Sequence, residues 1–186
     1  MTVTFIVERK NLRAGRWVHT ERAPLEAGAA RLRIDSFALT SNNITYAAFG
    51  DTMNYWRFYP TGDASTGCIP VWGFGTVVES RCDGVATGDR HYGYFPIADE
   101  AVLLPGRIGP LFFAPAQISK RNADWGATVL GRRIAKTWDA FLRTVTDPAH
   151  PWLRVVHGSG EAAVAATYRA LLDGKVPAQE GHVLTV

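Results

Sequence analysis

The fold is decided by the stretch PVWGFGTVVES at residues 70–80, which leads through a glycine-containing turn into GDRHYG at residues 88–93. A run of apolar and β-branched residues of this length is typical of a buried strand. Gly73 and Gly75 interrupt the run and indicate either a close approach of another backbone or a bulge. We therefore expect this stretch to form a strand, followed by a second strand over residues 90–96.

Shorter strands are expected on either side of this stretch. Apolar and polar residues alternate over residues 3–7 and again over residues 30–37, with a turn over residues 24–28 between them. Another short strand is expected over residues 101–104, and many short strands with glycine turns indicate a small barrel or sandwich. Residues 40–67 are irregular and rich in aromatic side chains, and loops of this length in compact domains tend to be functional.

Helices are expected after Pro105. Apolar residues recur at spacings of three and four over residues 129–145, which predicts an amphipathic helix. A second helix is expected over residues 164–172, ending at Gly174, a residue type favoured just after a helix. Residues 181–186 indicate a final strand.

A single domain over residues 1–186 is expected, because a chain of 186 residues can bury one core but is too short for two full domains. Apolar residues make up 47% of the chain and charged residues 20%, which is ordinary for a globular protein and argues against disorder. Residues 1–108 form a β-rich part and residues 109–186 a helical part, so the predicted fold class is α+β.

The charges and cysteines exclude several classes of partner. The 20 Lys and Arg residues exceed the 17 Asp and Glu residues by only 3 and form no basic stripe, so we expect no nucleic-acid partner. Cys68 and Cys82 match neither a metal-ligand spacing nor a disulfide framework, so we expect no metal. The opening residues lack a signal-peptide pattern, and no apolar run reaches the ~20 residues of a membrane span. We expect a cytoplasmic protein that does not contact a membrane.

Two blocks resemble the catalytic domain of the medium-chain dehydrogenase/reductase superfamily. Residues 32–43, LRIDSFALTSNN, resemble the strand that enters its active-site loop, and residues 70–80 resemble its P-x-x-G-x-x-x-x-G/V-x-V segment. The runs NNITY at residues 42–46 and YGYFP at residues 92–96 are similar to a bacterial branch of that superfamily, as is the stretch 112–184. The resemblance implies a GroES-like small β-barrel core with C-terminal helices and a terminal strand.

The resemblance also implies a doubly wound nucleotide-binding (Rossmann) domain, a unit of roughly 100–150 residues, between the two parts. Here residues 102–107, VLLPGR, run almost directly into residues 109–113, GPLFF, with no room for alternating strands and helices. We therefore expect that the Rossmann domain is deleted at about residues 105–110. Without it, we expect the chain to use no nicotinamide cofactor of its own.

One segment has the pattern of a dinucleotide site. A predicted strand over residues 152–157 is followed by GSGEAA at residues 158–163, which fits G-x-G-x-x-A, and Glu180 lies roughly 20 residues further on. A dinucleotide fold, however, needs several parallel strands, and a single strand–helix–strand unit cannot form its crevice. We interpret this unit as the one that completes the catalytic domain, although its helix N-terminus is able to hold an anion.

The resemblance places polar residues that face the substrate at Asn43 and Tyr46. A tyrosine hydroxyl can donate a proton to a developing enolate, and an asparagine amide can hold its oxygen. Zinc-dependent members use Cys and His ligands in this loop, which Asn42 and Asn43 cannot replace. The candidate catalytic residues are Tyr46, Asn43, Asp51 and His91, and the candidate substrate-binding residues are Tyr55, Trp56 and Tyr94.

Each candidate also has a structural interpretation. Tyr46 is alternatively a buried aromatic residue with a bonded hydroxyl, Asp51 a turn residue and His91 an exposed strand residue. The aromatic residues Tyr55, Trp56, Phe58 and Tyr59 are equally compatible with the core and with the wall of a pocket.

Three functions remain open. The first is a cofactor-independent enzyme that uses a reductase-type pocket for isomerisation, dehydration or cyclisation of a small carbonyl-bearing substrate, such as a natural product. The second is a noncatalytic binding or accessory protein, and the third is a reductase completed by a separate nucleotide-binding partner. In each case we expect a homodimer, because removing a domain exposes apolar residues near Leu111, Phe112 and Phe113.

Overall fold

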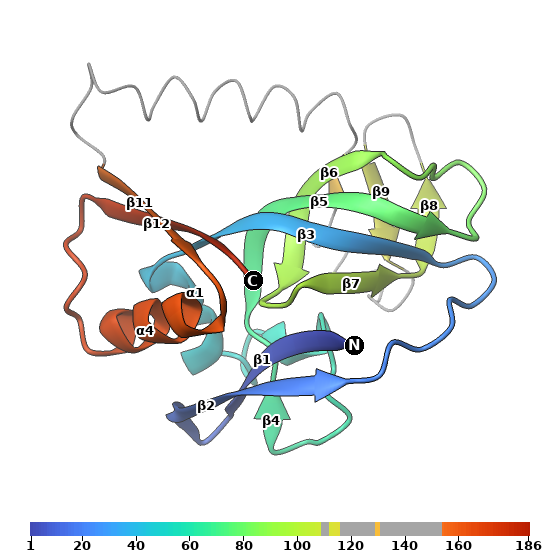
Figure 1. The fold of residues 1–186 in the computed structure, drawn as a ribbon. Helices are drawn as coiled ribbons and strands as arrows, with labels where there is room; N and C mark the ends of the chain where they lie inside the picture. The colour runs from blue at the N-terminus through green and yellow to red at the C-terminus, as the bar shows by residue number, and fades with distance from the viewer. Residues whose placement is uncertain (109–111, 116–128, 131–153) are drawn as a thin grey trace.

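The computed structural model describes residues 1–108, 112–115, 129–130 and 154–186, which adopt an α+β fold as predicted (Figure 1). A three-stranded sheet has the order β2-β1-β4, and a larger sheet has the order β11-β12-β3-β5-β6-β10-β9-β8, with β7 also paired to β3. The strands of the smaller sheet are β1 (Thr2–Glu8), β2 (Asn11–Thr20) and β4 (Thr66–Gly67). Those of the larger sheet are β3 (Ala30–Leu39), β5 (Pro70–Ser80), β6 (Arg90–Pro96), β7 (Glu100–Leu103), β8 (Pro105–Ile108), β9 (Phe112–Pro115), β10 (Val129–Leu130), β11 (Arg154–Ser159) and β12 (Glu180–Thr185).

The antiparallel strands β3, β5 and β6 lie at the middle of the larger sheet, and their bounds agree closely with the prediction. Gly73 of β5 lies opposite both Phe37 of β3 and Gly93 of β6. A Cβ atom at Gly73 would lie 2.4 Å from the backbone oxygen of Ser36. The glycine therefore permits the close strand approach that its position in the sequence indicates.

The two sheets share one hydrophobic core. Backbone bonds join β1 to the turn between β6 and β7, where the Phe5 amide donates to the oxygen of Ile97 at 2.8 Å. Side chains from both sheets then pack against each other, and burying this apolar surface is the main stabilising contribution to the fold. The largest fully buried side chains, which include some from α4 and from the turns, are Tyr168, Phe37, Phe95, Leu32, Leu39, Ile69, Ile97, Leu103, Leu184, Val7 and Val71.

The C-terminal unit completes the larger sheet, as predicted. The parallel strands β11 and β12 flank α4 (Glu161–Leu172), and β12 also pairs antiparallel with β3 (Figure 1). Gly174 follows the helix with φ +62°, the left-handed conformation that favours glycine after a helix. No helix in the described part of the chain is long and apolar enough to cross a lipid bilayer.

Three predictions about the elements need correction. The first predicted strand does not lead directly to the turn at residues 24–28, because β2 lies between them. Residues 40–67 are not wholly irregular, since they contain α1 (Ser41–Ala48) and the 3-10 helix η1 (Tyr55–Arg57). The predicted helix over residues 129–145 begins instead as the short strand β10, and its remainder lies outside the described residues.

Candidate active site

Three of the predicted site residues, Tyr46, Tyr55 and Tyr94, pack against each other, and with Phe58 and Trp72 they form what we call the tyrosine cluster. The ring of Tyr46 stacks on that of Tyr55 with 4.6 Å between centroids, and lies 5.9 Å from that of Tyr94. Trp72 contacts the Tyr94 ring edge-on at 4.4 Å. Such aromatic pairs stabilise each other beyond the area that they bury, so the cluster is a preformed surface.

Separate elements bring these side chains together. Tyr46 lies on α1 and Tyr55 on η1, whereas Trp72 and Tyr94 lie directly opposite each other on β5 and β6. Residues directly opposite on antiparallel strands project to the same face of the sheet. The two helical segments therefore cover one face of the β5–β6 pair, and their tyrosines meet the strand residues there.

Tyr94 is buried beside the side chains of Tyr46 and Trp72. Burial raises the pKa of Tyr94 well above its usual value, and interaction with the Tyr46 hydroxyl raises it further, while the Trp72 side chain opposes the shift. Tyr94 thus keeps its proton at neutral pH. Tyr94 is buried, but Tyr46 and Tyr55 are only half-buried, so the proton of Tyr46 is the one that a ligand can meet.

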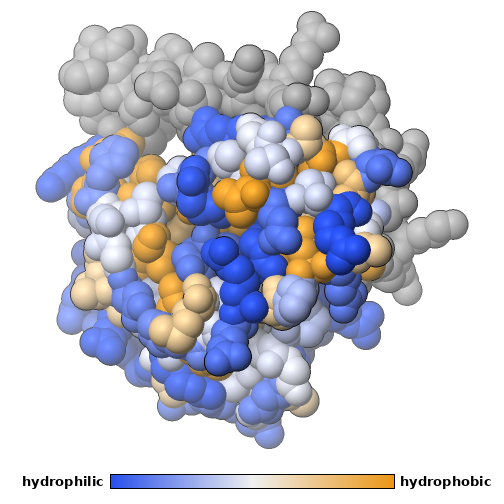
Figure 2. Space-filling view, turned by 45° about the vertical axis from the view of Figure 1, so that its right-hand side comes forward, coloured by the Kyte–Doolittle hydropathy of each residue, from blue (hydrophilic) through white to orange (hydrophobic). Residues whose placement is uncertain are grey.

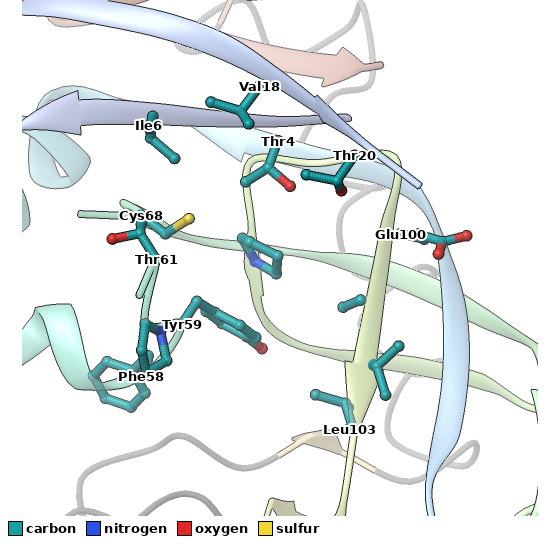
Figure 3. Close-up of a pocket in the computed structure, with 14 residues that line it drawn as sticks. Thr4, Ile6, Val18, Thr20, Phe58, Tyr59, Thr61, Cys68, Glu100 and Leu103 are labelled. Atoms are coloured by element: carbon teal, nitrogen blue, oxygen red, sulfur yellow. The ribbon is translucent and has the colours of Figure 1, made fainter. Parts of the chain in front are cut away.

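A cavity of about 370 Å³ lies behind the cluster, a volume within the range of small-molecule sites. Phe58 and Tyr59 form its wall on the cluster side, and the Tyr59 hydroxyl donates to the backbone oxygen of Tyr94 at 2.6 Å. Figure 3 shows the Tyr59 ring directed into the hollow, with Ile6 and Val18 on the far side and Glu100 at one end. The wall residues therefore couple the cavity to the backbone that carries Tyr94.

Cys68 lines this cavity and is expected to resist alkylation. Burial raises the pKa of its thiol to about 12, and only the thiolate reacts. We expect iodoacetamide at pH 8 to modify Cys68 roughly a thousandfold more slowly than an ordinary exposed thiol. Cys82 is half-buried, and mass spectrometry of the native protein should show it modified first. Equal rates at the two cysteines would contradict the burial of Cys68, and urea should abolish the difference.

Asn43 does not belong to the tyrosine cluster. Its side chain is buried, and its Oδ1 accepts hydrogen bonds from the amide and hydroxyl of Thr40 at 2.8 Å and 3.2 Å. Its Nδ2 donates to the backbone oxygen of Pro70 at 2.9 Å. Asn43 thus caps the first turn of α1 and fixes the helix to the start of β5, which positions Tyr46 one turn later.

The other candidates also lie apart from the cluster. The Asp51 side chain is 78% exposed and lies 3.6 Å from the guanidinium of Arg9. His91 is buried rather than exposed, and alternation along β6 directs it away from the face that carries Tyr94. Trp56 belongs to the main core, where Cβ atoms at Gly50 and Gly67 would overlap its ring.

Sequence reasoning left Phe58 and Tyr59 open between core and pocket wall, and it missed Trp72. The sequence does carry a signal for an aromatic face on these strands. Residues two apart on one strand share a face, so Trp72 and Phe74 lie on one face of β5. Their partners on β6 are Tyr94 and Tyr92. Phe58 and Tyr59 follow the short 3-10 helix η1, and no periodic pattern in the sequence predicts the direction of that helix. Their place in the wall depends on tertiary contacts that the local sequence does not report.

The glycine pattern at residues 158–163 does not fit a nicotinamide dinucleotide. A Cβ atom at Gly158 would lie 2.8 Å from Leu184 and 3.2 Å from Ala163, so this glycine serves packing within the unit. β11 and β12 are the one parallel pair among the described strands, whereas the pyrophosphate crevice lies between strands of an extended parallel sheet. Within the described residues there is also no group of three or more His, Cys, Asp or Glu side chains placed to hold a metal ion.

Comparison with solved structures yields several enzymes of similar fold. The chain is similar to the CurF ER cyclopropanase from the curacin A biosynthetic pathway, with 18% identity and a TM-score of 0.42 over 91% of this chain and 51% of that one. It is similar to the quinone oxidoreductase of Escherichia coli complexed with NADPH, with 11% identity and a TM-score of 0.39 over 83% and 44%. It is also similar to the CurK enoyl reductase, with 16% identity and a TM-score of 0.40 over 93% of this chain and 52% of that one.

These solved structures are members of the medium-chain dehydrogenase/reductase superfamily. The chain spans about half the length of each of them, and identities of 11–18% with TM-scores of 0.39–0.42 carry no conclusion about its activity. No curated protein matches the sequence. The profile of one family does match, over residues 37–110 and 109–177, and the chain therefore belongs to the family described as protein of unknown function (DUF2855).

Proposed function

We propose that the chain binds a small carbonyl-bearing molecule against the tyrosine cluster and that Tyr46 donates a proton to its oxygen, with no nicotinamide cofactor. The observation that carries this proposal is the contact of half-buried Tyr46 with buried Tyr94, whose rings lie 5.9 Å apart, so that a second, protonated hydroxyl lies beside that of Tyr46. Negative charge that develops on the Tyr46 oxygen as its proton leaves is then stabilised by the proton of Tyr94. Tyr55 and Trp72 provide flat apolar surfaces for the rest of the molecule.

The step is a keto–enol conversion. The O–H of Tyr46 donates a hydrogen bond to the carbonyl oxygen, which weakens the C–H bond on the adjacent carbon. A base in solution removes the proton of that C–H bond while the Tyr46 proton moves to the oxygen, so that an enol forms and no electrons are gained or lost. Isomerisation, dehydration and cyclisation of carbonyl compounds all begin with such a step, and a positioned general acid contributes about 10²–10⁴-fold.

Two observations support a mechanism that uses no nucleotide-binding domain. The two segments that match the family profile meet at residues 109–110, where the resemblance places the deletion. The strand pairing of the C-terminal unit also does not provide a crevice between parallel strands of an extended sheet. A reductase completed by a separate partner, or a protein that binds without catalysis, would differ from the proposal in the following experiment.

Deuterium exchange tests the proposal directly. The protein is incubated with cyclohexanone in deuterated buffer without any nucleotide, and loss of the protons next to the carbonyl is followed by proton NMR. We expect a protein-dependent rate that is proportional to protein concentration and exceeds that of the buffer. Saturable binding without exchange would indicate the accessory function instead, and exchange at the buffer rate would overturn the proposal.

The homodimer remains a proposal beside this one. The apolar junction residues Leu111, Phe112 and Phe113 have side chains outside the described part of the chain. On the face shown in Figure 2, the described apolar side chains form small groups separated by hydrophilic ones. The dimer contact stays a proposal at the junction, and light scattering at tens of micromolar checks it through the mass in solution.

A further inference from the structure

A second cavity, of about 360 Å³, lies where the start of α1 meets β12 and the segment that follows α4. Its walls are mainly apolar, and its polar members are Thr40, Ser41, Glu180 and His182. The apolar members are Ala38, Val155, Leu171, Val176, Pro177, Ala178 and Val183. It shares no lining residue with the tyrosine cluster, and its volume suits a small ligand.

Glu180 and His182 form an acid–imidazole pair in this cavity. They lie two residues apart on β12, so both side chains project to the same face of the sheet. Nε2 of His182 lies 3.0 Å from Oε1 of Glu180, and the two side chains are only 11% and 15% exposed. A carboxylate placed beside an imidazole in this way orients the ring and stabilises it when it takes up a proton.

The two ring nitrogens of His182 have different surroundings. Nε2 is buried and faces Oε1 of Glu180 at 3.0 Å, so the carboxylate is its partner. Nδ1 is not among the buried atoms and makes no hydrogen bond to the described residues. The pair therefore leaves Nδ1 to bond a polar group of a ligand in the cavity.

The charges around the pair indicate the kind of polar group. Arg154 of β11 lies opposite Glu180 in the parallel register, and its guanidinium is 3.6 Å from Oε2 of Glu180. A carboxylate on the ligand would be repelled by Glu180, and an ammonium group would have to compete with Arg154 for the same carboxylate. A hydroxyl is uncharged and both donates and accepts hydrogen bonds, so it suits the imidazole beside this balanced ion pair.

We infer that this cavity is a second ligand site, which takes a small, mainly apolar molecule with one hydroxyl group bonded to the imidazole of His182. The apolar walls hold the body of the ligand, and Glu180 orients the imidazole for the hydroxyl. This site does not depend on the reaction proposed for the tyrosine cluster. Ser41 at the start of α1 lines it, whereas Tyr46 is five residues further along the helix, about 7.5 Å of helical rise.

The test uses phenol as the probe and anisole, which has no hydroxyl proton, as its matched control. Each is titrated into the 15N-labelled full chain, and the imidazole nitrogens are followed by long-range proton–nitrogen NMR, with the His182 signal identified by its loss in His182→Phe. We expect phenol to shift the His182 nitrogens saturably, and anisole to bind at least tenfold more weakly. Tyr46→Phe should leave phenol binding unchanged, which separates this site from the proposed reaction.

Two variants keep the test decisive. Ala178→Trp places a large side chain at an exposed lining position, and it should abolish the phenol shift while His182 remains in place. Glu180→Gln should weaken phenol binding about tenfold, because the orienting charge is lost. Equal binding of phenol and anisole, or a phenol shift that survives Ala178→Trp, would overturn the inference.

Discussion

Tyr46→Phe is expected to slow deuterium exchange into cyclohexanone by about 100-fold or more, because it removes the hydroxyl that donates the proton. The ring remains, so its stacking on Tyr55 and its contact with Tyr94 should persist. Tyr46 is half-buried, and the loss of folding free energy should stay near or below about 1 kcal/mol. Thermal unfolding and NMR exchange, measured on the same preparation, separate the two effects.

Tyr168→Phe is the matched control for this substitution. The hydroxyl of Tyr168 donates to the backbone oxygen of Leu12 at 2.8 Å, and the residue is buried in the main core. Its removal should cost about 1 kcal/mol of folding free energy and leave the exchange rate per folded molecule unchanged. If Tyr46→Phe behaves like Tyr168→Phe, the Tyr46 hydroxyl is structural and the proposed step is wrong.

Arg31→Leu is expected to have the largest effect on stability. The Arg31 side chain is 3% exposed and donates to Glu79 at 3.1 Å, Glu100 at 2.6 Å and the backbone oxygen of Ala23 at 2.6 Å. Among the described residues, its loss leaves the buried carboxylate of Glu100 with the half-exposed Arg22 as its one ion-pair partner. Removing one member of a buried ion pair costs about 3–5 kcal/mol, which urea unfolding measures.

Arg33→Leu on the same strand serves as the control, because its side chain is 63% exposed and bonded to Asp35. Exposed ion pairs contribute about 0–1 kcal/mol, so the midpoint of unfolding should hardly move. A double variant that also carries Glu100→Gln should recover part of the stability lost in Arg31→Leu, since no unpaired charge is then buried. An Arg31→Leu protein as stable as Arg33→Leu would contradict this assignment.

The central strands could be predicted from the sequence because their signals are local. The apolar run with Gly73 and the alternation over residues 30–37 each correspond to a strand with buried neighbours on both sides. β2 was harder to detect, because this edge strand pairs with β1 alone and is half-exposed along its length. Strand signals are weak where one face is polar and glycine interrupts the pattern, as at Gly15.

The helix α1 was missed because its own residues favour helices poorly. Asn43, Ile44 and Thr45 all have low helix propensity, and the helix depends on the cap that Asn43 forms with Thr40 and on its bond to Pro70. That bond spans 27 residues and leaves no local trace. A pattern of asparagine before a β-branched pair is equally compatible with a loop.

The grouping of the candidate side chains could be predicted only in part, for the same reason. Tyr46, Tyr55 and Tyr94 carry chemistry that the sequence shows, but their convergence depends on how α1 and η1 lie across β5 and β6. Asp51 follows Tyr46 by only five residues, yet its side chain faces solvent beside Arg9. The residue types thus indicate the chemistry, but tertiary packing determines which of the candidate residues lie together in the tyrosine cluster.

The most direct test of the proposed function is the exchange rate of the wild-type protein, freed of nucleotides, with and without added NADPH. The proton of Tyr46 and the cluster that orients it are part of this chain, so the proposed step needs no cofactor. We predict the same protein-dependent exchange into cyclohexanone in both samples, and no consumption of NADPH. Exchange or reduction that appears only after NADPH is added would contradict a cofactor-independent function.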